Sequence, residues 1–193
     1  MFEIYRYTDS DQSLWDNFVP NANNGTLFHL RSFLRYHPRD RFLDHSLLVK
    51  KKDKLFSVFP AAEQEIDGSR YLVSHPGSSV GSFVVPVDLS IADAIDLVDS
   101  LLMYSKKLKF DGIRITLPPN LYQRRLSNYM DFSFLKNNFN YLKREITSIL
   151  YLENSLELTI QKFRSSHIRS IKKARKKGVE IRRSEDFKSF FNI

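Results

Sequence analysis

One basic stretch near the C-terminus, residues 161–177, constrains this chain more than any other feature. It holds eight Lys and Arg residues and no acidic residue. The chain has 30 Lys and Arg and 22 Asp and Glu, so the part outside this stretch has 22 of each. The net charge of +8 is therefore a local feature, and any account of the protein must explain where it lies.

The spacing of apolar residues predicts that this stretch is helical. Side chains at steps of three and four residues form one stripe. The members of the stripe are Leu156, Ile160, Phe163, His167, Ile168, Ile171 and Ala174. Asn154 or Ser155 can cap the helix, and Gly178 marks its end. We therefore expect one long helix over residues 155–178, with an apolar side and a basic side.

Composition narrows the class of protein. A chain of 193 residues with 42% hydrophobic residues, 16 of them Phe, can bury a real core, so a disordered protein is excluded. There is no cysteine, which rules out disulfides and Cys-containing zinc sites, and the five histidines show no metal spacing. We expect no metal site and no transmembrane segment, because no run approaches the length of a membrane span. A cytoplasmic location is expected.

Periodicity and turn residues predict alternating strands and helices. Strands are predicted at residues 2–7, 45–50, 55–66, 70–74, 113–117, 141–152 and 179–182. Helices are predicted between the caps at 8–10 and Pro20, at 26–36, 90–108, 120–130, 132–139 and 155–178, and after Ser184. Asp67-Gly68 is a strong hairpin signal, so the strands on either side of it should pair antiparallel. The order indicates an α+β fold with a mostly antiparallel, mixed sheet flanked by helices.

Four stretches carry a resemblance to a known family. They are Trp15-Asp16-Asn17-Phe18, Asn24 to His29 leading to Phe33, the loop His75 to Ser82, and RSIKKARKKGVEI at 169–181. The last resembles an RxxIRKAxKxGVxV-type run of the FemAB-like branch of the GNAT acyltransferases. The resemblance implies two tandem GNAT-like domains joined by a basic helix. We therefore expect a GNAT-like domain at 1–154, a connecting helix at 155–178 and the start of a second, truncated domain at 179–193.

The loop 75–82 is the main candidate for contact with a substrate. Its glycines permit close approach of a ligand, although a Gly/Ser-rich turn between a strand and a helix needs no ligand to explain it. The helix at 26–36 adds His29 and Arg35 as candidates. A charged residue such as Arg35 is more often simply exposed on a helix than in contact with a substrate. The candidate substrate-binding residues are His29, Arg35, His75, Gly77, Ser78, Ser79 and Gly81.

The residues of the chemical step are not identified by the sequence. Glu63 and Glu65 are candidates for a catalytic base only because of where they lie in the order of elements that the resemblance implies. The better interpretation is that both are exposed carboxylates on a strand without a catalytic role. The Q/R-x-x-G-x-G/A phosphate-binding signature of GNAT enzymes is not intact. Direct binding of acetyl-CoA by the first domain is therefore in doubt.

The basic residues of the long helix have three interpretations. They can be solvated, they can bind a polyanion such as tRNA or another phosphate-bearing group, or they can pair with acidic residues of a further domain. Like charges at helical spacing repel, which slightly favours a partner. The candidate residues for polyanion or interdomain contact are Arg164, Arg169, Lys172, Lys173, Arg175, Lys176 and Lys177.

The resemblance implies an acyl- or aminoacyl-transferase that acts on an amine of a cell-envelope precursor or sugar. The donor would be acyl-CoA or aminoacyl-tRNA, and the partner a second GNAT-like domain. Two alternatives remain open. The chain could be a non-catalytic nucleic-acid or polyanion-binding module that uses residues 161–177, or a degenerate GNAT-like scaffold that mediates protein contacts.

Overall fold

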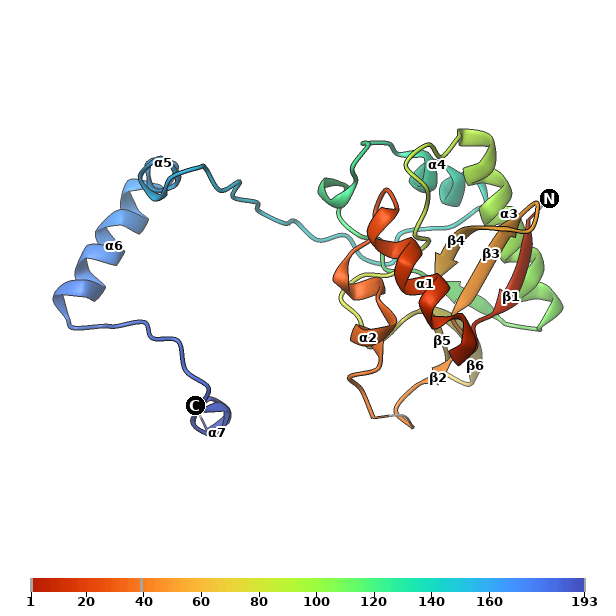
Figure 1. The fold of residues 1–193 in the computed structure, drawn as a ribbon, viewed down its shortest axis with the longest axis horizontal. Coiled ribbons are helices and arrows are strands. Elements are labelled where there is room, and N and C mark those ends of the chain that lie inside the picture. Colours follow the sequence, from red (N-terminus) through yellow and green to blue (C-terminus); the bar gives the residue numbers. More distant parts are fainter. Residues whose placement is uncertain (1, 39, 193) are drawn as a thin grey trace. The chain divides into compact units, whose positions relative to one another are not determined.

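The computed structural model describes residues 2–38 and 40–192, which form two compact units (Figure 1). The first unit spans 1–141 and the second 142–193. The prediction that a second GNAT-like domain begins at residue 179 stays a prediction.

The first unit is built on two small sheets. One has the order β1-β3-β4, formed by β1 Glu3–Arg6, β3 Leu47–Lys51 and β4 Lys54–Phe59, all antiparallel. The other has the order β2-β5-β6-β7, formed by β2 Leu43–Asp44, β5 Ala61–Ile66, β6 Ser69–Ser74 and β7 Gly112–Arg114. In this second sheet β6 and β7 are parallel, and the other pairs are antiparallel.

Pro60 explains why one predicted strand, 55–66, becomes two. Proline has no backbone N–H, so it interrupts the hydrogen-bonding ladder between β4 and β5. Backbone bonds continue across the break, because His45 N donates to Ala61 O at 2.9 Å and His75 N donates to the Pro60 carbonyl at 3.1 Å. The two sheets therefore adjoin at this residue, and His75 lies at the junction.

The hairpin predicted at Asp67-Gly68 is confirmed, and a second hairpin joins β3 to β4. Asp67 and Gly68 join β5 to β6 with φ of 51° and 76°, and Lys52 and Asp53 join β3 to β4 with φ of 50° and 62°. Two successive residues with positive φ are typical of the type I′ turn, which matches the twist of antiparallel strands.

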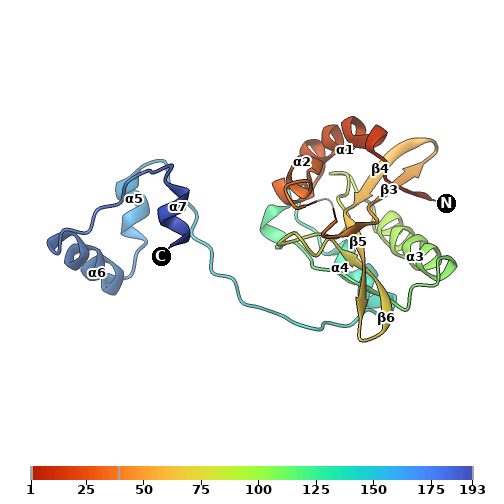
Figure 2. The ribbon, with the colours of Figure 1, turned by 90° about the horizontal axis from the view of Figure 1, so that it is seen from below.

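The structure contains seven α-helices in the described residues, of which α1 to α4 belong to the first unit and α5 to α7 to the second. Their bounds are α1 Gln12–Phe18, α2 Arg31–Leu34, α3 Ile91–Lys107, α4 Tyr129–Lys136, α5 Leu156–Gln161, α6 Ser165–Lys176 and α7 Phe187–Phe191. In the first unit α1 and α2 lie on one side of the strands and α3 and α4 on the other (Figure 2). The α+β class, with a mixed sheet flanked by helices, is confirmed.

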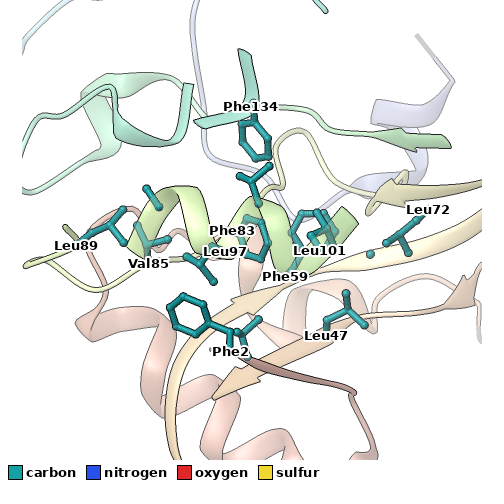
Figure 3. Packing of buried hydrophobic residues seen from close by; sticks show 14 of the residues in the cluster. Phe2, Leu47, Phe59, Leu72, Phe83, Val85, Leu89, Leu97, Leu101 and Phe134 are labelled. Atoms are coloured by element: carbon teal, nitrogen blue, oxygen red, sulfur yellow. The ribbon is translucent and has the colours of Figure 1, made fainter. Parts of the chain in front are cut away.

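Two apolar clusters follow from this layering. The larger packs Phe59, Phe83, Leu97, Leu101 and Phe134 between the strands and the helices α3 and α4 (Figure 3). The helix predicted at 90–108 is observed as α3, and Ser90 caps it by accepting a bond from Asp93 N at 3.1 Å. Burying a side chain of this size stabilises the fold by about 1.5–3 kcal/mol.

The smaller cluster lies on the α1 side. Trp15 is fully buried there with Val19, Leu48, Val58 and Val84. Its indole Nε1 donates to the carbonyl of residue 29 at 2.7 Å, which satisfies the polar atom inside the apolar cluster.

Two predicted helices of the first unit are wrong in extent. The stretch 26–36 contains a 3₁₀ turn, Leu27–His29, and then the single turn α2, because Leu30 between them is extended, with ψ of 140°. At 120–130 a 3₁₀ turn, Asn120–Tyr122, precedes an irregular stretch. There Asn23 O accepts from Arg124 N, and the Asn23 side chain exchanges two bonds with residue 125, so tertiary hydrogen bonds replace helical ones.

The second unit contains three short helices. The predicted long helix is divided at Lys162–Arg164 into α5 and α6, where Ser165 and Ser166 open the second helix. Serine suits a helix start better than a helix interior, because its hydroxyl competes for backbone groups. Ser155 caps α5 as predicted, and Gly178 ends α6 at a φ of 75°.

The strands predicted at 141–152 and 179–182 are wrong, because both stretches are irregular. A strand is stable only when its backbone groups pair with a neighbouring strand. Among residues 142–192 there is no strand to provide that pairing. In these two stretches a strand-like sequence was not sufficient to form a strand. The cap of α7 is also shifted from the predicted Ser184 to Asp186, whose side chain accepts from Ser189 N.

Candidate functional site

The loop that joins β6 to α3, residues 75–90, is bordered by many buried polar side chains. Buried polar groups are costly unless they are hydrogen-bonded, so such a concentration indicates either a structural network or a binding site. We call these side chains the buried polar cluster. Its members are Asn24, His29, Arg31, His37, Ser46, Ser74, His75 and Ser82.

His29 and His37 fasten the loop from the α2 side. His29 Nδ1 accepts from Thr26 N at 3.1 Å, and its Nε2 donates to Gly81 O at 3.1 Å. His37 Nε2 lies 2.7 Å from Gly77 O. A Cβ on residue 77 would lie 2.3 Å from His37 Nε2, so glycine is required at this close approach. Both nitrogens of His29 are thus used within the protein.

His75 lies at the junction of the two sheets and is 3% exposed. Its Nδ1 accepts from Gly77 N at 3.3 Å. Burial lowers the pKa of His75 to about 4, with the charge of Asp44 opposing this change and those of Arg31 and His37 adding to it. The ring is therefore neutral at physiological pH.

Arg31 and Asp44 form a buried ion pair beside this histidine. The guanidinium bonds the Asp44 carboxylate and donates to Ser46 Oγ at 2.9 Å, and it lies 3.8 Å from the centre of the Tyr7 ring. Burial raises the pKa of Asp44, but Arg31 and the bonds from Ser46 outweigh it, so this pKa is lowered overall. The carboxylate is ionised and its side chain is 37% exposed.

Gly81 lies where β6 and β7 separate. Beyond the last paired residues, Ser74 Oγ accepts from Thr116 N at 2.8 Å, and Gly81 N donates to Thr116 O at 2.8 Å. Further along, Val84 bridges to Val58. In open sheets a ligand commonly binds at the carboxyl ends of parallel strands. Here the chain itself fills that position.

The start of α3 offers no phosphate-binding cradle either. Ser90 occupies the cap, and Asp93 in the first turn pairs with Lys51. Anions bind at helix N-termini through free N–H groups, and a carboxylate in the first turn disfavours them. The residues present therefore do not fit the pyrophosphate of an acyl-CoA at this helix.

A small pocket lies next to this region. Its lining is rich in amide and hydroxyl side chains, including Asn23, Asn24, Ser82, Asn120 and Gln123. None of its described lining residues is Lys or Arg. Asn24 holds the wall in place by donating to Phe83 O and accepting from Val85 N.

The two glutamates considered as bases lie elsewhere. Glu63 Oε1 pairs with His45 Nδ1 at 2.8 Å, and its Oε2 pairs with Arg70 at 2.6 Å, while His45 Nε2 bonds Tyr104 Oη at 2.8 Å. This chain of bonds joins α3 to β5 and β6. Glu65 is exposed on β5. Neither carboxylate belongs to the buried polar cluster.

The remaining substrate-binding candidates separate into two places. Ser78 belongs to the loop, where its hydroxyl donates to Phe28 O or Val80 O, and Ser79 is exposed. Arg35 bonds Asp9 at 2.6 Å and also Gln12, on the exposed side of α1. The structure thus brings His29, His75 and residues 77–81 together but leaves Arg35 apart.

The candidate residues for polyanion or interdomain contact are all exposed. Arg164 is the cap residue of α6, and Lys177 follows its last turn. The second unit has ion pairs of its own, Lys162 with Glu153 and Arg182 with Glu180, but none involves these seven residues in the described part. The basic side of α6 is free of acidic neighbours there.

Two features are absent from the part of the chain that the structure describes. No three His, Asp or Glu side chains gather as a metal-binding group, and no helix has the length and apolar character needed to cross a membrane.

Neither a protein-family model nor a curated protein matches the sequence. Among solved structures the chain is similar to a transcriptional regulator from Bacillus halodurans C-125, at a TM-score of 0.50 and 10% identity, covering 77% of this chain and 99% of that one. It is also similar to a GNAT family acetyltransferase of Staphylococcus aureus subsp. aureus USA300_TCH1516. The TM-score is 0.48 and the sequence identity 13%, and the match covers 77% of this chain and 98% of that one. A third similar structure is an aminoglycoside N-acetyltransferase in complex with CoA. Here the TM-score is 0.43 and the sequence identity 13%, and the match covers 80% of this chain and 96% of that one. At such identities the likeness is one of fold.

Proposed function

We propose that this chain is the acceptor-binding part of a GNAT-type acyltransferase of the FemAB-like branch. Its acceptor is an amine of a cell-envelope precursor or sugar. The observation that carries the proposal is the buried polar cluster around the loop 75–82, which lies where parallel strands β6 and β7 end. The resemblance of residues 169–181 to the FemAB-like connecting helix supports it.

The acyl donor is assigned to another part of the protein. Gly81 bonds Thr116 beyond the ends of β6 and β7, and the start of α3 carries Asp93 in place of a phosphate cradle. We therefore propose that acyl-CoA is held by a second GNAT-like domain, the expected partner of this one, and that the site works in the cytoplasm. The first unit then contributes by binding and orienting the amine.

Calorimetry with the chain tests this assignment. Binding of small primary amines without binding of acetyl-CoA is the expected result. Acyl transfer is followed separately with a thiol reagent, which reacts with released CoA but not with a protein that has no cysteine. If the chain binds neither amines nor acetyl-CoA, the proposal is wrong and a scaffold role is favoured.

A second function is favoured by one observation, the basic side of α6. Exposed bases without acidic neighbours attract phosphates, and such binding weakens linearly in log affinity with log salt. Changing Lys172, Lys173, Lys176 and Lys177 to Gln should then abolish binding of tRNA. The matched control changes four exposed lysines of the first unit, at 106, 107, 109 and 136, by the same charge. Equal loss in both variants, or no binding at low salt, excludes a specific polyanion site.

A further inference from the structure

The hairpin between β3 and β4 concentrates positive charge at one end of its sheet. Its residues 51–54 read Lys-Lys-Asp-Lys, and Lys51 lies directly opposite Lys54 in the strand register. Like charges directly opposite each other on two strands are destabilising. Lys51 pairs with Asp93 at 2.5 Å, whereas Lys52 and Lys54 are exposed. A bound anion would therefore stabilise this arrangement of charges.

An open hollow of about 410 Å³ adjoins the hairpin. The three lysines of the hairpin line it together with the apolar side chains of Phe18, Leu55, Phe56 and Pro86. Among its described lining residues one is acidic, Asp88. Small-molecule sites commonly have volumes of about 300–1,000 Å³. The hollow thus has the size of a ligand site, and its excess of basic residues favours an anion.

The hollow exists because a neighbouring segment leaves β4 at this point. Val58 N donates to Val84 O at 3.3 Å and Val84 N donates to Val58 O at 2.8 Å, but this is an isolated bridge. Pro86, which has no backbone N–H, then begins a turn in which its carbonyl accepts from Leu89 N at 3.2 Å. The loop before α3 therefore turns away from the strand, and Leu55 forms part of the wall that is left.

The apolar walls come from three separate parts of the first unit. Phe18 is the last residue of α1, Phe56 lies on β4, and Pro86 belongs to the loop before α3. These side chains are partly buried, so each still presents some of its surface. Phe56 is held by Phe2, with ring centres 4.8 Å apart, and Phe18 packs against the smaller apolar cluster. Fixed apolar and aromatic surfaces of this kind are suited to an aromatic ring.

We propose that this hollow binds a small phosphate ester with an aromatic body. A phosphate monoester carries a charge of about −1.5 to −2 near pH 7, which matches two lysines. Its oxygens accept from Lys52 and Lys54, and its ring lies against Phe18 and Phe56. Lys51 contributes less, because Asp93 already neutralises it.

This inference goes beyond the proposed function. The described lining of the hollow shares no residue with the buried polar cluster, and the ligand is an anion and not the acceptor amine. A failure of amine binding therefore leaves the inference untouched, and a failure of phosphate binding leaves the acceptor function untouched.

Binding of defined probes to the full chain, followed by backbone amide shifts, tests the proposal. Phenyl phosphate carries both groups, inorganic phosphate carries the charge alone, and phenol carries the ring alone. Phenyl phosphate should bind more tightly than the other two, with shifts at Leu55, Phe56 and Asp88. Added salt should weaken its binding, because exposed charges are screened. If phenyl phosphate and inorganic phosphate bind equally well, or if neither binds, the proposal is overturned.

Adenosine monophosphate, measured beside phenyl phosphate, distinguishes two sources of the same chemistry. Tighter binding of adenosine monophosphate assigns the site to a nucleotide, and tighter binding of phenyl phosphate assigns it to an aryl ester without a ribose.

The role of the charges is tested by a double variant. Lys52→Gln together with Lys54→Gln should weaken phenyl phosphate binding about tenfold, whereas Lys51 is left unchanged because it pairs with Asp93. The matched control changes two exposed lysines near the end of α3, at 106 and 107, to Gln and should keep the affinity of the wild type. Equal losses in the two variants would reflect net charge alone and would contradict the proposal.

The role of the ring is tested by Phe18→Leu, which keeps an apolar side chain. This variant should bind phenyl phosphate more weakly and inorganic phosphate as the wild type does. An unchanged affinity for phenyl phosphate in this variant would show that the ring of the ligand does not lie against Phe18. Trp15 fluorescence and the amide spectrum establish whether each variant is folded, and the lysine variants decide the question if Phe18→Leu does not fold.

Discussion

The two units of the chain obey the same local rules but differ in what stabilises them. In the first unit helices and strands enclose two apolar clusters and the buried polar cluster. In residues 142–192 Thr159 is the one buried residue, while Ile181 is 99% exposed and Phe190 is 69% exposed. Caps and turns therefore suffice to place helix ends, but isolated helices of this length are marginal in water. In the first unit the additional stability comes from apolar side chains of each helix and strand that are buried against other elements.

The largest expected effect comes from removing one buried ring. Phe83→Ala should lower the free energy of unfolding by about 3–5 kcal/mol, because it leaves a cavity at the centre of the larger cluster. Phe190→Ala in α7 should change it by less than about 0.5 kcal/mol. Urea unfolding followed by the fluorescence of Trp15, the single tryptophan, measures the first variant, and circular dichroism measures the helices of the second unit in the other variant. Equal losses in the two variants would contradict the contrast between the units.

Ion pairs provide the next comparison. Arg31→Met removes a buried guanidinium that bonds Asp44 and Ser46, and should cost about 1–3 kcal/mol, because the Asp44 side chain is 37% exposed and water takes over part of its solvation. Lys162→Met breaks a pair with Glu153 whose side chains are 37% and 41% exposed, and should cost less than about 1 kcal/mol. The same urea measurements apply, with circular dichroism for α5. A small loss for Arg31→Met would show that the cluster is more hydrated than its burial indicates.

Acid should destabilise the first unit through its buried histidines. Burial lowers the pKa values of His29, His45 and His75 from 6.5, whereas the unfolded chain takes up protons there. Unfolding is then favoured as the pH falls from about 6.5 towards 4. His75 alone should account for about 2 kcal/mol at about pH 4.5. The carboxylate of Asp44, whose pKa is lowered, contributes only below about pH 4.

A pH series of urea unfolding curves checks this, with His75→Gln as the variant. The variant should lose part of the slope between about pH 6.5 and 4.5. His167→Gln is the control, because that histidine is exposed in α6. An unchanged slope in His75→Gln means that the other buried histidines carry the effect.

The smallest effect is expected for the basic helix. Changing Lys172, Lys173, Lys176 and Lys177 to Gln removes repulsion between like charges. The free energy of helix formation in α6 should become more favourable by a few tenths of a kcal/mol, which circular dichroism would show as a slightly higher helix content. The unfolding of the first unit should not change. A loss of its stability in this variant would mean that the two units are energetically coupled.

Features that depend on neighbours in the sequence were predicted well. The helix at 90–108, the Asp67-Gly68 hairpin and the end of α6 at Gly178 all follow from residues within a few positions of each other. The predicted loop 75–82 does lie among buried polar groups, but no pattern of neighbouring residues predicted the contact of Arg31 with Asp44 or of His37 with Gly77. These residues meet only because β2 and the end of β6 come together.

The sequence by itself determined the α+β class, the order of most elements of the first unit and the local charge of α6, because helical and strand periodicities and turn residues act over short distances. Only the folded structure shows that the chain divides at Pro60 into β4 and β5, and that residue 84 pairs with Val58 of β4. It also shows that His75, which precedes a glycine-containing loop, is buried, so that its pKa is lowered. Each of these depends on backbone hydrogen bonds between distant residues, and on burial, which no local pattern records.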